Sequence, residues 1–98
     1  ESWKLITEDI VSHFTQKVYI NFDIDGLDRK YCPHTGTPVH GGFEVLQVFY
    51  LFKKIVQSGR QLIGFDLCEV GVSTNEWDEN VGARVLFKLS NLMVSNFP

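Results

Sequence analysis

The sequence predicts an α/β fold, and more narrowly a fragment of a three-layer doubly wound domain with a parallel sheet. Two observations support this prediction. Helix-like and strand-like segments alternate along the 98 residues in the order helix, strand, loop, helix, strand, loop, helix, as in one right-handed βαβ unit plus flanking helices. A parallel sheet is covered on both faces and normally has more than two strands. Two strands and three helices are therefore too few for a complete domain.

The two predicted strands are short runs rich in apolar side chains. Residues 18–22, VYINF, combine β-branched and aromatic side chains, a composition typical of a buried strand. Residues 61–68, QLIGFDLC, form the second run. A long loop, residues 23–42, follows the first strand, and a loop with Gly, Ser, Thr and Asn follows the second. Because a helix connects the strands, we expect them to pair in parallel.

Three segments have the apolar spacing of helices. Residues 7–16 predict a short amphipathic helix with Thr7 as its N-cap. Residues 43–58 are rich in apolar side chains, which predicts a largely buried helix ended by Gly59 as the C′ residue. Residues 78–95 predict a final helix with one apolar face. That face consists of Val81, Val85, Leu86, Leu89, Leu92 and Met93.

Composition and charge exclude several function classes. The formal net charge of −3, with both signs mixed along the chain, gives no basic surface for nucleic acid. No apolar run approaches the ~18 residues of a membrane span, and no signal-peptide pattern is expected at the N-terminus. Cys32 and Cys68 lie in different elements without CxxC spacing, which indicates reduced thiols. We therefore expect a cytoplasmic protein that binds neither nucleic acid nor membrane.

Three aspartates, Asp23, Asp25 and Asp28, follow the first predicted strand. Open α/β sheets bind ligands at the carboxyl ends of their strands. Carboxylates buried side by side repel each other, so such a cluster needs a cation, basic side chains or exposure to water. Arg29 and Lys30 are close in sequence, so compensation by basic side chains is one interpretation. If a metal binds, oxygen ligands without a Cys/His quartet favour manganese or magnesium over zinc.

Two ordered motifs point to a known family. FDIDGLD at residues 22–28 is followed by TGTP at residues 35–38 and by Gly41 and Gly42. GFDLCEV at residues 64–70 is the second motif. Both resemble the C-terminal motifs of the ureohydrolase family, whose members include arginase, agmatinase and formimidoylglutamase. The resemblance implies that residues 1–98 are the C-terminal part of a single ureohydrolase-like α/β domain.

The resemblance implies an enzyme that hydrolyses a linear C–N bond in a guanidinium or amidine substrate, using two manganese ions and releasing urea. Asp23 and Asp25 match the family's metal-ligating pair. On a regular strand residues i and i+2 face the same side, so both carboxylates can reach one site. Glu69 matches the glutamate that holds the guanidinium through charge-assisted hydrogen bonds. Thr37 matches a threonine near the substrate-binding rim, where its hydroxyl either contacts substrate or caps the loop.

The neighbouring polar residues have less specific expectations. We expect Asp28 to stabilise the loop as an Asx turn rather than to bind metal. Asp66 is expected to be hydrogen-bonded, either in support of the metal site or for structure alone. Arg29 replaces a proline that is usual in the family, and His34 and His40 are expected to be solvated. The family's remaining metal ligands and its catalytic histidine lie upstream of the matched region. These 98 residues alone are therefore predicted to be inactive and to contain no catalytic residue.

Other interpretations remain open. TGTP favours an arginase-like or agmatinase-like substrate over formimidoylglutamate, which stays as an alternative. A non-enzymatic module that binds one calcium or magnesium ion through DIDGLD is a second interpretation, although the sequence lacks the 12-residue loop and closing glutamate of an EF-hand. An inactive relative kept for assembly is a third. At full length, the protein is expected to be a homo-oligomer.

Overall fold

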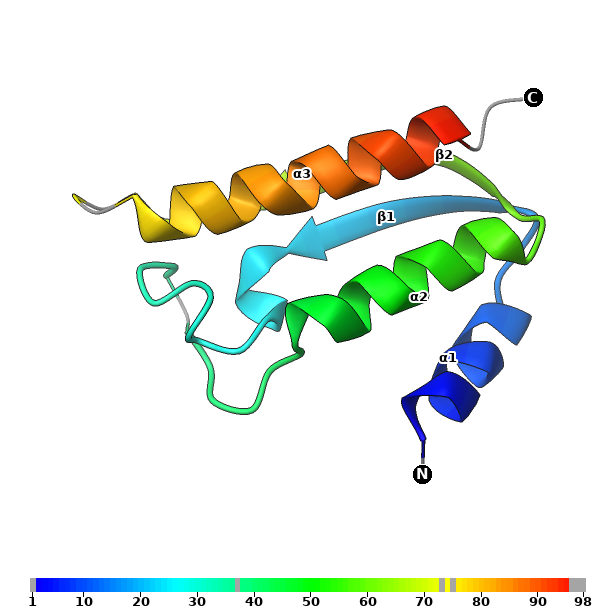
Figure 1. Cartoon of the computed structure of the whole chain (residues 1–98), viewed down its shortest axis with the longest axis horizontal. Coiled ribbons are helices and arrows are strands. Elements are labelled where there is room, and N and C mark those ends of the chain that lie inside the picture. Colours follow the sequence, from blue (N-terminus) through cyan, green and yellow to red (C-terminus); the bar gives the residue numbers. More distant parts are fainter. Residues whose placement is uncertain (1, 37, 73, 75, 96–98) are drawn as a thin grey trace.

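The computed structural model describes residues 2–36, 38–72, 74 and 76–95. Helices and strands alternate in it as the sequence predicts, and the fold is α/β (Figure 1). The elements are α1 (Trp3–Ser12), β1 (Lys17–Asp23), the 3₁₀ turn η1 (Ile24–Gly26), α2 (Val45–Gln57), β2 (Gln61–Cys68) and α3 (Trp77–Ser95). Among these residues, no helix is both long enough and apolar enough to cross a membrane.

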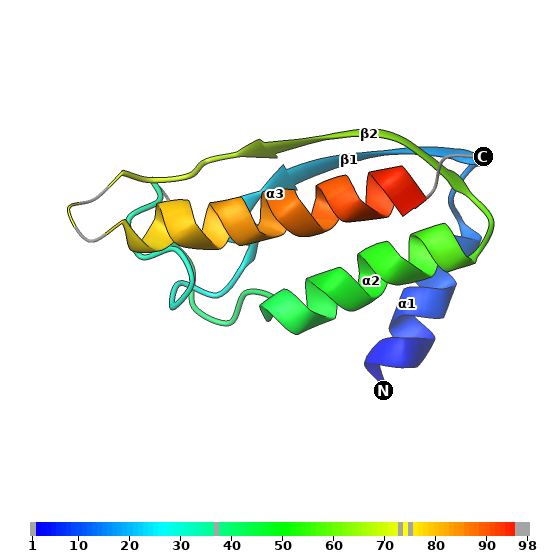
Figure 2. The same cartoon turned by 45° about the horizontal axis from the view of Figure 1, so that its top comes forward.

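The two strands pair in parallel and α2 connects them, which confirms the predicted βαβ unit. The pairing runs from Lys17 and Gln61 at the start to Asp23 and Cys68 at the end. Figure 2 shows α2 and α3 on the same side of the sheet, with α1 beside α2. Both strands therefore end at one edge of the sheet, near the loops that precede α2 and α3.

One irregularity interrupts the register near the start of the sheet. Val18 pairs with Leu62, but the next residue, Tyr19, pairs with Gly64. Ile63 is thus an extra residue on β2, and its side chain is 52% exposed. Such a bulge changes which residues of the two strands lie side by side along the rest of the sheet.

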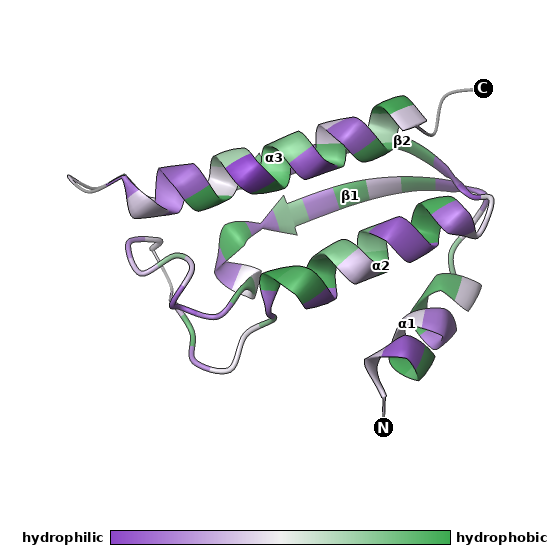
Figure 3. Cartoon of the chain, viewed as in Figure 1, coloured by the Kyte–Doolittle hydropathy of each residue, from purple (hydrophilic) through white to green (hydrophobic). Residues whose placement is uncertain are grey.

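The core lies between one face of the sheet and the helices α2 and α3. Ile20 and Phe22 of β1 are buried there, and the ring of Phe22 meets that of Phe52 edge-on, with centroids 5.9 Å apart. Hydrophobic and hydrophilic residues alternate along β1 (Figure 3), as expected for a strand with one covered face. The buried apolar residues are Val11, Ile20, Phe22, Ile24, Leu27, Cys32, Val48, Phe52, Ile55, Leu62, Val85 and Leu89.

The first helix begins and ends earlier than the sequence predicts. It spans Trp3–Ser12 rather than residues 7–16, and its N-cap is Ser2, whose Oγ accepts a hydrogen bond from the N–H of Leu5 at 3.2 Å. Thr7 is fully buried inside the helix and is not its N-cap. Serine and threonine are both good N-caps. Sequence pattern alone did not distinguish the earlier Ser2 from Thr7.

The second helix begins slightly later than predicted. Its first residue is Val45 and its N-cap is Glu44, whose N–H donates to Gln47 Oε1 at 2.9 Å. Its C-cap is Ser58, and Gly59 follows with a φ of +86°. A left-handed residue directly after the C-cap is a common helix end, so the prediction of Gly59 as the C′ residue is confirmed.

The third helix, Trp77–Ser95, begins one residue before the predicted 78–95. Val85 and Leu89 are buried as predicted, but Leu86 is 47% exposed. The helix is buried along a narrow stripe that contains Val85 and Leu89, and Leu86 lies about 100° further round the helix. The predicted apolar face was therefore too wide.

Candidate functional site

The candidate site lies at the edge of the sheet where both strands end. Asp23 is the last residue of β1 and pairs with Cys68, the last residue of β2. Asp25 follows in η1, and Glu69 comes directly after β2. Neighbouring strands are about 4.8 Å apart. The parallel topology therefore brings three predicted site residues from two distant parts of the sequence to one edge.

Asp23 and Asp25 stand on different kinds of backbone. Asp23 is exposed at the end of the strand, whereas Asp25 is partly buried in the 3₁₀ turn. The strand extends one residue further than the predicted 18–22, and the regular-strand geometry used to relate the two carboxylates does not apply, because the backbone leaves the extended conformation after Asp23. Ile24 and Leu27 are fully buried and anchor the turn, and the N–H of Leu27 donates to the carbonyl of Ile24 at 3.0 Å. The turn thus sets the relative placement of the two carboxylates.

The residues that the structure describes contain no group of three or more His, Cys, Asp or Glu side chains arranged to hold a metal ion. Asp23 and Asp25 nevertheless provide two oxygen donors, the ligand type that manganese and magnesium take. These two carboxylates fit part of such a centre, and ligands from elsewhere in the protein would have to complete it.

Glu69 has an unusual backbone conformation. Its φ is +67°, in the left-handed region that costs a non-glycine residue about 1–2 kcal/mol. Its main-chain carbonyl accepts a hydrogen bond from the hydroxyl of Thr35 at 2.6 Å. The residue as a whole is exposed. Backbone strain of this kind is common where a side chain must take a particular direction at a functional site.

Asp28 stabilises the loop that follows the turn. Its Oδ1 accepts a hydrogen bond from the N–H of Lys30, and its Oδ2 accepts one from the N–H of Gly41, both at 3.0 Å. These backbone hydrogen bonds, that from Lys30 first, lower the pKa of Asp28 from its ordinary value. The prediction that Asp28 forms an Asx turn is confirmed.

The two ends of the same loop lie directly against each other. The N–H of Asp28 donates to the carbonyl of Phe43, and the N–H of Phe43 donates to the carbonyl of Gly26, both at 2.9 Å. A Cβ on Gly42 would lie 2.6 Å from the carbonyl carbon of Leu27. Only glycine allows so close an approach of two backbones, which explains the second glycine of the GG motif.

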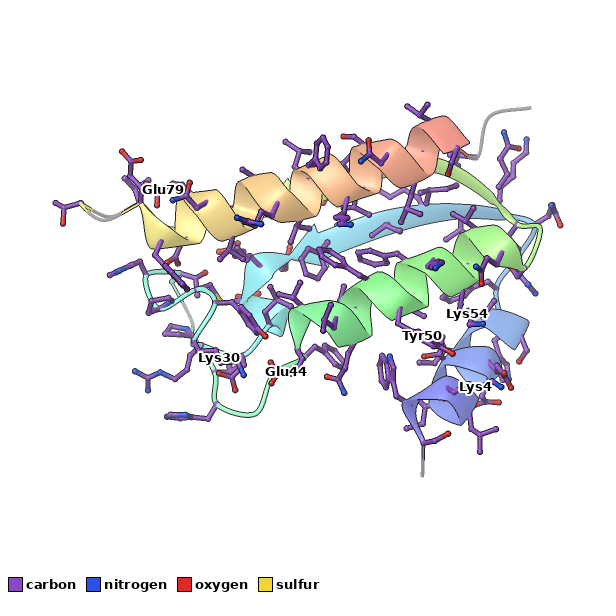
Figure 4. The ribbon with its side chains drawn as sticks, in the orientation of Figure 1. Lys4, Lys30, Glu44, Tyr50, Lys54 and Glu79 are labelled. Atoms are coloured by element: carbon purple, nitrogen blue, oxygen red, sulfur yellow. The ribbon has the colours of Figure 1, made fainter. Side chains whose placement is uncertain are left out.

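The basic side chains near the aspartates make contacts elsewhere. Lys30 Nζ forms an ion pair with Glu44 Oε1 at 2.6 Å, and Figure 4 shows the two side chains beside each other. Arg29 Nη1 lies 2.9 Å from His40 Nε2. After the backbone hydrogen bonds described above, the charge of Lys30 also lowers the pKa of Asp28, so Lys30 compensates that one carboxylate in part. His34 and His40 are exposed, as predicted.

Glu44 ties the loop to the start of α2. Tyr31 Oη donates to Glu44 Oε2 at 2.7 Å, in addition to the ion pair with Lys30. The hydrogen bonds from Lys30 and then from Tyr31 lower the pKa of Glu44. The same contacts raise the pKa values of Lys30 and Tyr31. The ion pair is exposed, so its contribution to stability is modest.

Asp66 forms hydrogen bonds with side chains of both strands. Tyr19 Oη donates to Asp66 Oδ2 at 3.0 Å, and Cys68 Sγ lies 3.6 Å from Asp66 Oδ1. The hydrogen bond to Asp66 raises the pKa of Tyr19, and desolvation followed by the same carboxylate raises the pKa of the Cys68 thiol. The expectation that Asp66 is hydrogen-bonded is confirmed. Cys32 and Cys68 are both free thiols, as predicted.

Sequence reasoning missed two residues, Thr35 and Asp78. Thr35 belongs to the TGTP motif but received no role, and Thr37, the residue singled out there, lies outside the described residues. Asp78 is fully buried in the first turn of α3, and its Oδ2 accepts a hydrogen bond from the N–H of His34 at 3.0 Å. No local pattern could have revealed Asp78, because its partner lies in a distant loop.

Similarity to known proteins identifies the family of the chain. A sequence model of the arginase family matches residues 2–90. The chain belongs to the arginase family. Arginase-1 from Sus scrofa is 41% identical over 68 residues, which cover 69% of this chain and 21% of that protein. Guanidinobutyrase from Pseudomonas aeruginosa is 33% identical over 96 residues, which cover 91% of this chain and 30% of that protein.

The fold of the arginase family is shared as well. The crystal structure of a hypothetical agmatinase from Burkholderia thailandensis superposes with a TM-score of 0.78 at 33% identity. The superposition covers 94% of this chain and 29% of that structure. The βαβ unit and its helices therefore correspond to part of the arginase and agmatinase fold. The chain spans between 21% and 30% of the length of these three relatives.

Proposed function

We propose that this chain is part of a metal-dependent hydrolase that cleaves a linear C–N bond in a guanidinium or amidine substrate. The main support is that Asp23, Asp25 and Glu69 lie at or directly after the carboxyl ends of two adjacent parallel strands. Relatives named arginase-1 and guanidinobutyrase support the same substrate class. Together with TGTP, these names favour an arginase-like or agmatinase-like reaction that releases urea.

In this proposal, Asp23 and Asp25 hold two manganese ions together with ligands from other parts of the full-length protein. Bound manganese lowers the pKa of a coordinated water and so provides hydroxide near neutral pH. The two carboxylates repel each other unless a cation compensates them. The buried side chains of Ile24 and Leu27 hold the turn that carries Asp25. The fold therefore positions these two ligands in part before metal binds.

Glu69 binds the substrate in the same proposal. A carboxylate can accept two parallel hydrogen bonds from a planar guanidinium, which provides both charge and direction. The Glu69→Gln variant keeps the shape and removes the charge. Because a hydrogen bond to a charged group contributes about 1.5–3 kcal/mol, the variant should raise KM roughly tenfold to a hundredfold. Manganese content should be unchanged.

The test is manganese-dependent urea release by the full-length protein. Asp23→Ala and Asp25→Ala should each abolish urea release and reduce the bound manganese. Asp9→Ala, which removes an exposed carboxylate from α1, is the matched control and should leave both measurements unchanged. Circular dichroism should show that all three variants fold. Full activity and manganese content in both site variants would refute the metal assignment.

Three further expectations from the sequence remain predictions. The protein is expected to act in the cytoplasm and to form a homo-oligomer at full length. Residues 1–98 alone are expected to release no urea, because two carboxylates cannot complete a binuclear centre. The same assay on the isolated segment checks this, and sedimentation of the full-length protein gives its oligomeric state. Activity on formimidoylglutamate instead of arginine or agmatine would select the alternative substrate.

A further inference from the structure

The main chain of Glu69 accepts a hydrogen bond from Thr35 of the TGTP motif. The hydroxyl of Thr35 donates to the carbonyl of Glu69 at 2.6 Å, across 34 positions of sequence. Thr35 is only 5% exposed, so this short hydrogen bond is largely shielded from water. Glu69 has a φ of +67°. The hydrogen bond therefore holds the main chain of Glu69, which directly follows β2 and has a left-handed backbone.

Thr35 is itself fixed by its neighbours. The N–H of His34 donates to Oδ2 of Asp78, a carboxylate that is fully buried in the first turn of α3. Oδ1 of Asp78 has no hydrogen-bond partner among the described residues. A Cβ on Gly71 would overlap the main-chain carbonyl of His34, so these backbones are in close contact. The loop thus packs directly against the segment that follows β2, and the hydrogen bond from His34 to Asp78 links it to α3.

We propose that Thr35 is a positioning residue for Glu69, and that Asp78 holds the loop from which Thr35 acts. Thr35 sets the left-handed backbone of Glu69 and thereby the direction of its carboxylate. This inference rests on the proposed function, because Glu69 is the group assigned there to the guanidinium. Thr35 acts through Glu69 and needs no contact with substrate or metal.

Removal of the Thr35 hydroxyl should weaken substrate binding and leave the metal centre intact. Without the hydrogen bond, the backbone of Glu69 can relax to an extended conformation, which turns its carboxylate away from the substrate. The loss of one well-formed hydrogen bond predicts a rise in KM of about tenfold. Manganese content and kcat should change by less than about threefold. A general loss of structure would instead lower the active fraction, and so kcat, without changing KM.

The experiment uses Thr35→Val, which keeps the shape and removes the hydroxyl, and Thr35→Ser, which keeps the hydroxyl. Both are made in the manganese-loaded full-length protein, alone and together with Glu69→Gln. We expect Thr35→Val to raise KM about tenfold and Thr35→Ser to restore it. In the Glu69→Gln background, Thr35→Val should have no further effect on KM, because the group that it positions is already impaired.

Each other outcome is informative. An equal rise in KM with and without the Glu69→Gln change would overturn the positioning role, as would an unchanged KM in Thr35→Val when Glu69→Gln alone raises it. If Glu69→Gln does not change KM, the proposed function of Glu69 fails first. If Thr35→Val does not fold, Thr35→Cys, whose thiol is a weak donor, provides the same comparison with a smaller expected rise.

Discussion

The close backbone approach at Gly42 predicts a large effect from the smallest possible substitution. In Gly42→Ala, the new Cβ would lie 2.6 Å from the carbonyl carbon of Leu27 and 2.7 Å from the nitrogen of Asp28, where an ordinary contact begins at 3.4 Å. The two backbones would have to separate by about 0.8 Å. Hydrogen bonds of 2.9 Å that join Asp28 and Gly26 to Phe43 would lengthen to about 3.7 Å and would be lost.

We therefore expect Gly42→Ala to reduce the free energy of unfolding by about 2–4 kcal/mol, from overpacking and from two weakened hydrogen bonds. Denaturant unfolding of the full-length protein measures this loss. Gly36→Ala is the matched control, because it lies in the same loop with nothing within 4 Å of its Cβ, and it should change the free energy by less than about 0.5 kcal/mol. Equal stability of the two variants would refute the reasoning.

Two further predictions concern the ion pair and the core. Because Lys30 and Tyr31 lower the pKa of Glu44 below 4.5, their contact stabilises the fold above about pH 4.5 and is lost as pH falls through the lowered value. Near neutral pH, the Glu44→Gln variant should therefore unfold at a lower denaturant concentration than the unmodified protein, whereas in acid the two should unfold at the same concentration. A difference between their unfolding midpoints that persists in acid would contradict this. Leu89→Ala should cost about 2–5 kcal/mol in the same assay, because Leu89 is fully buried. Leu46→Ala, at an 80% exposed position, should cost far less, and equal losses would argue against the described core.

Local patterns predicted the order of the elements and the edge of the sheet where the acids lie. The apolar runs at residues 18–22 and 61–68 predicted both strands, and Asp23 and Glu69 follow them as expected. The role of Gly59 could be predicted because the residue after a helix often has a left-handed backbone, and glycine is the usual residue there. These features depend on neighbours in sequence, so a single sequence contains enough information to find them.

Contacts between distant residues were not predictable in the same way. Asp78 resembles any acid in the first turn of a helix, and only the fold shows that it binds the N–H of His34. Thr35 stands in a recognised motif, yet its partner is the main chain of Glu69, which carries no side-chain signal. The 3₁₀ turn at Asp25 was missed because it needs two buried anchors to form, and burial is a property of the whole fold.

The bulge at Ile63 sets the register of β2 against β1, and so the relative position of Asp23 and Glu69 at the strand ends. If Ile63 instead paired with Tyr19 in a regular ladder, each later residue of β2 would lie one place further along β1, and Asp23 would pair with Leu67 instead of Cys68. Side chains alternate between the faces of a strand, so Phe65 and Leu67 would turn away from the helices. Glu69 would also lie about 3.3 Å further beyond Asp23. The bulge at Ile63 thus keeps the apolar face of β2 packed and keeps Glu69 closer to Asp23 along the sheet.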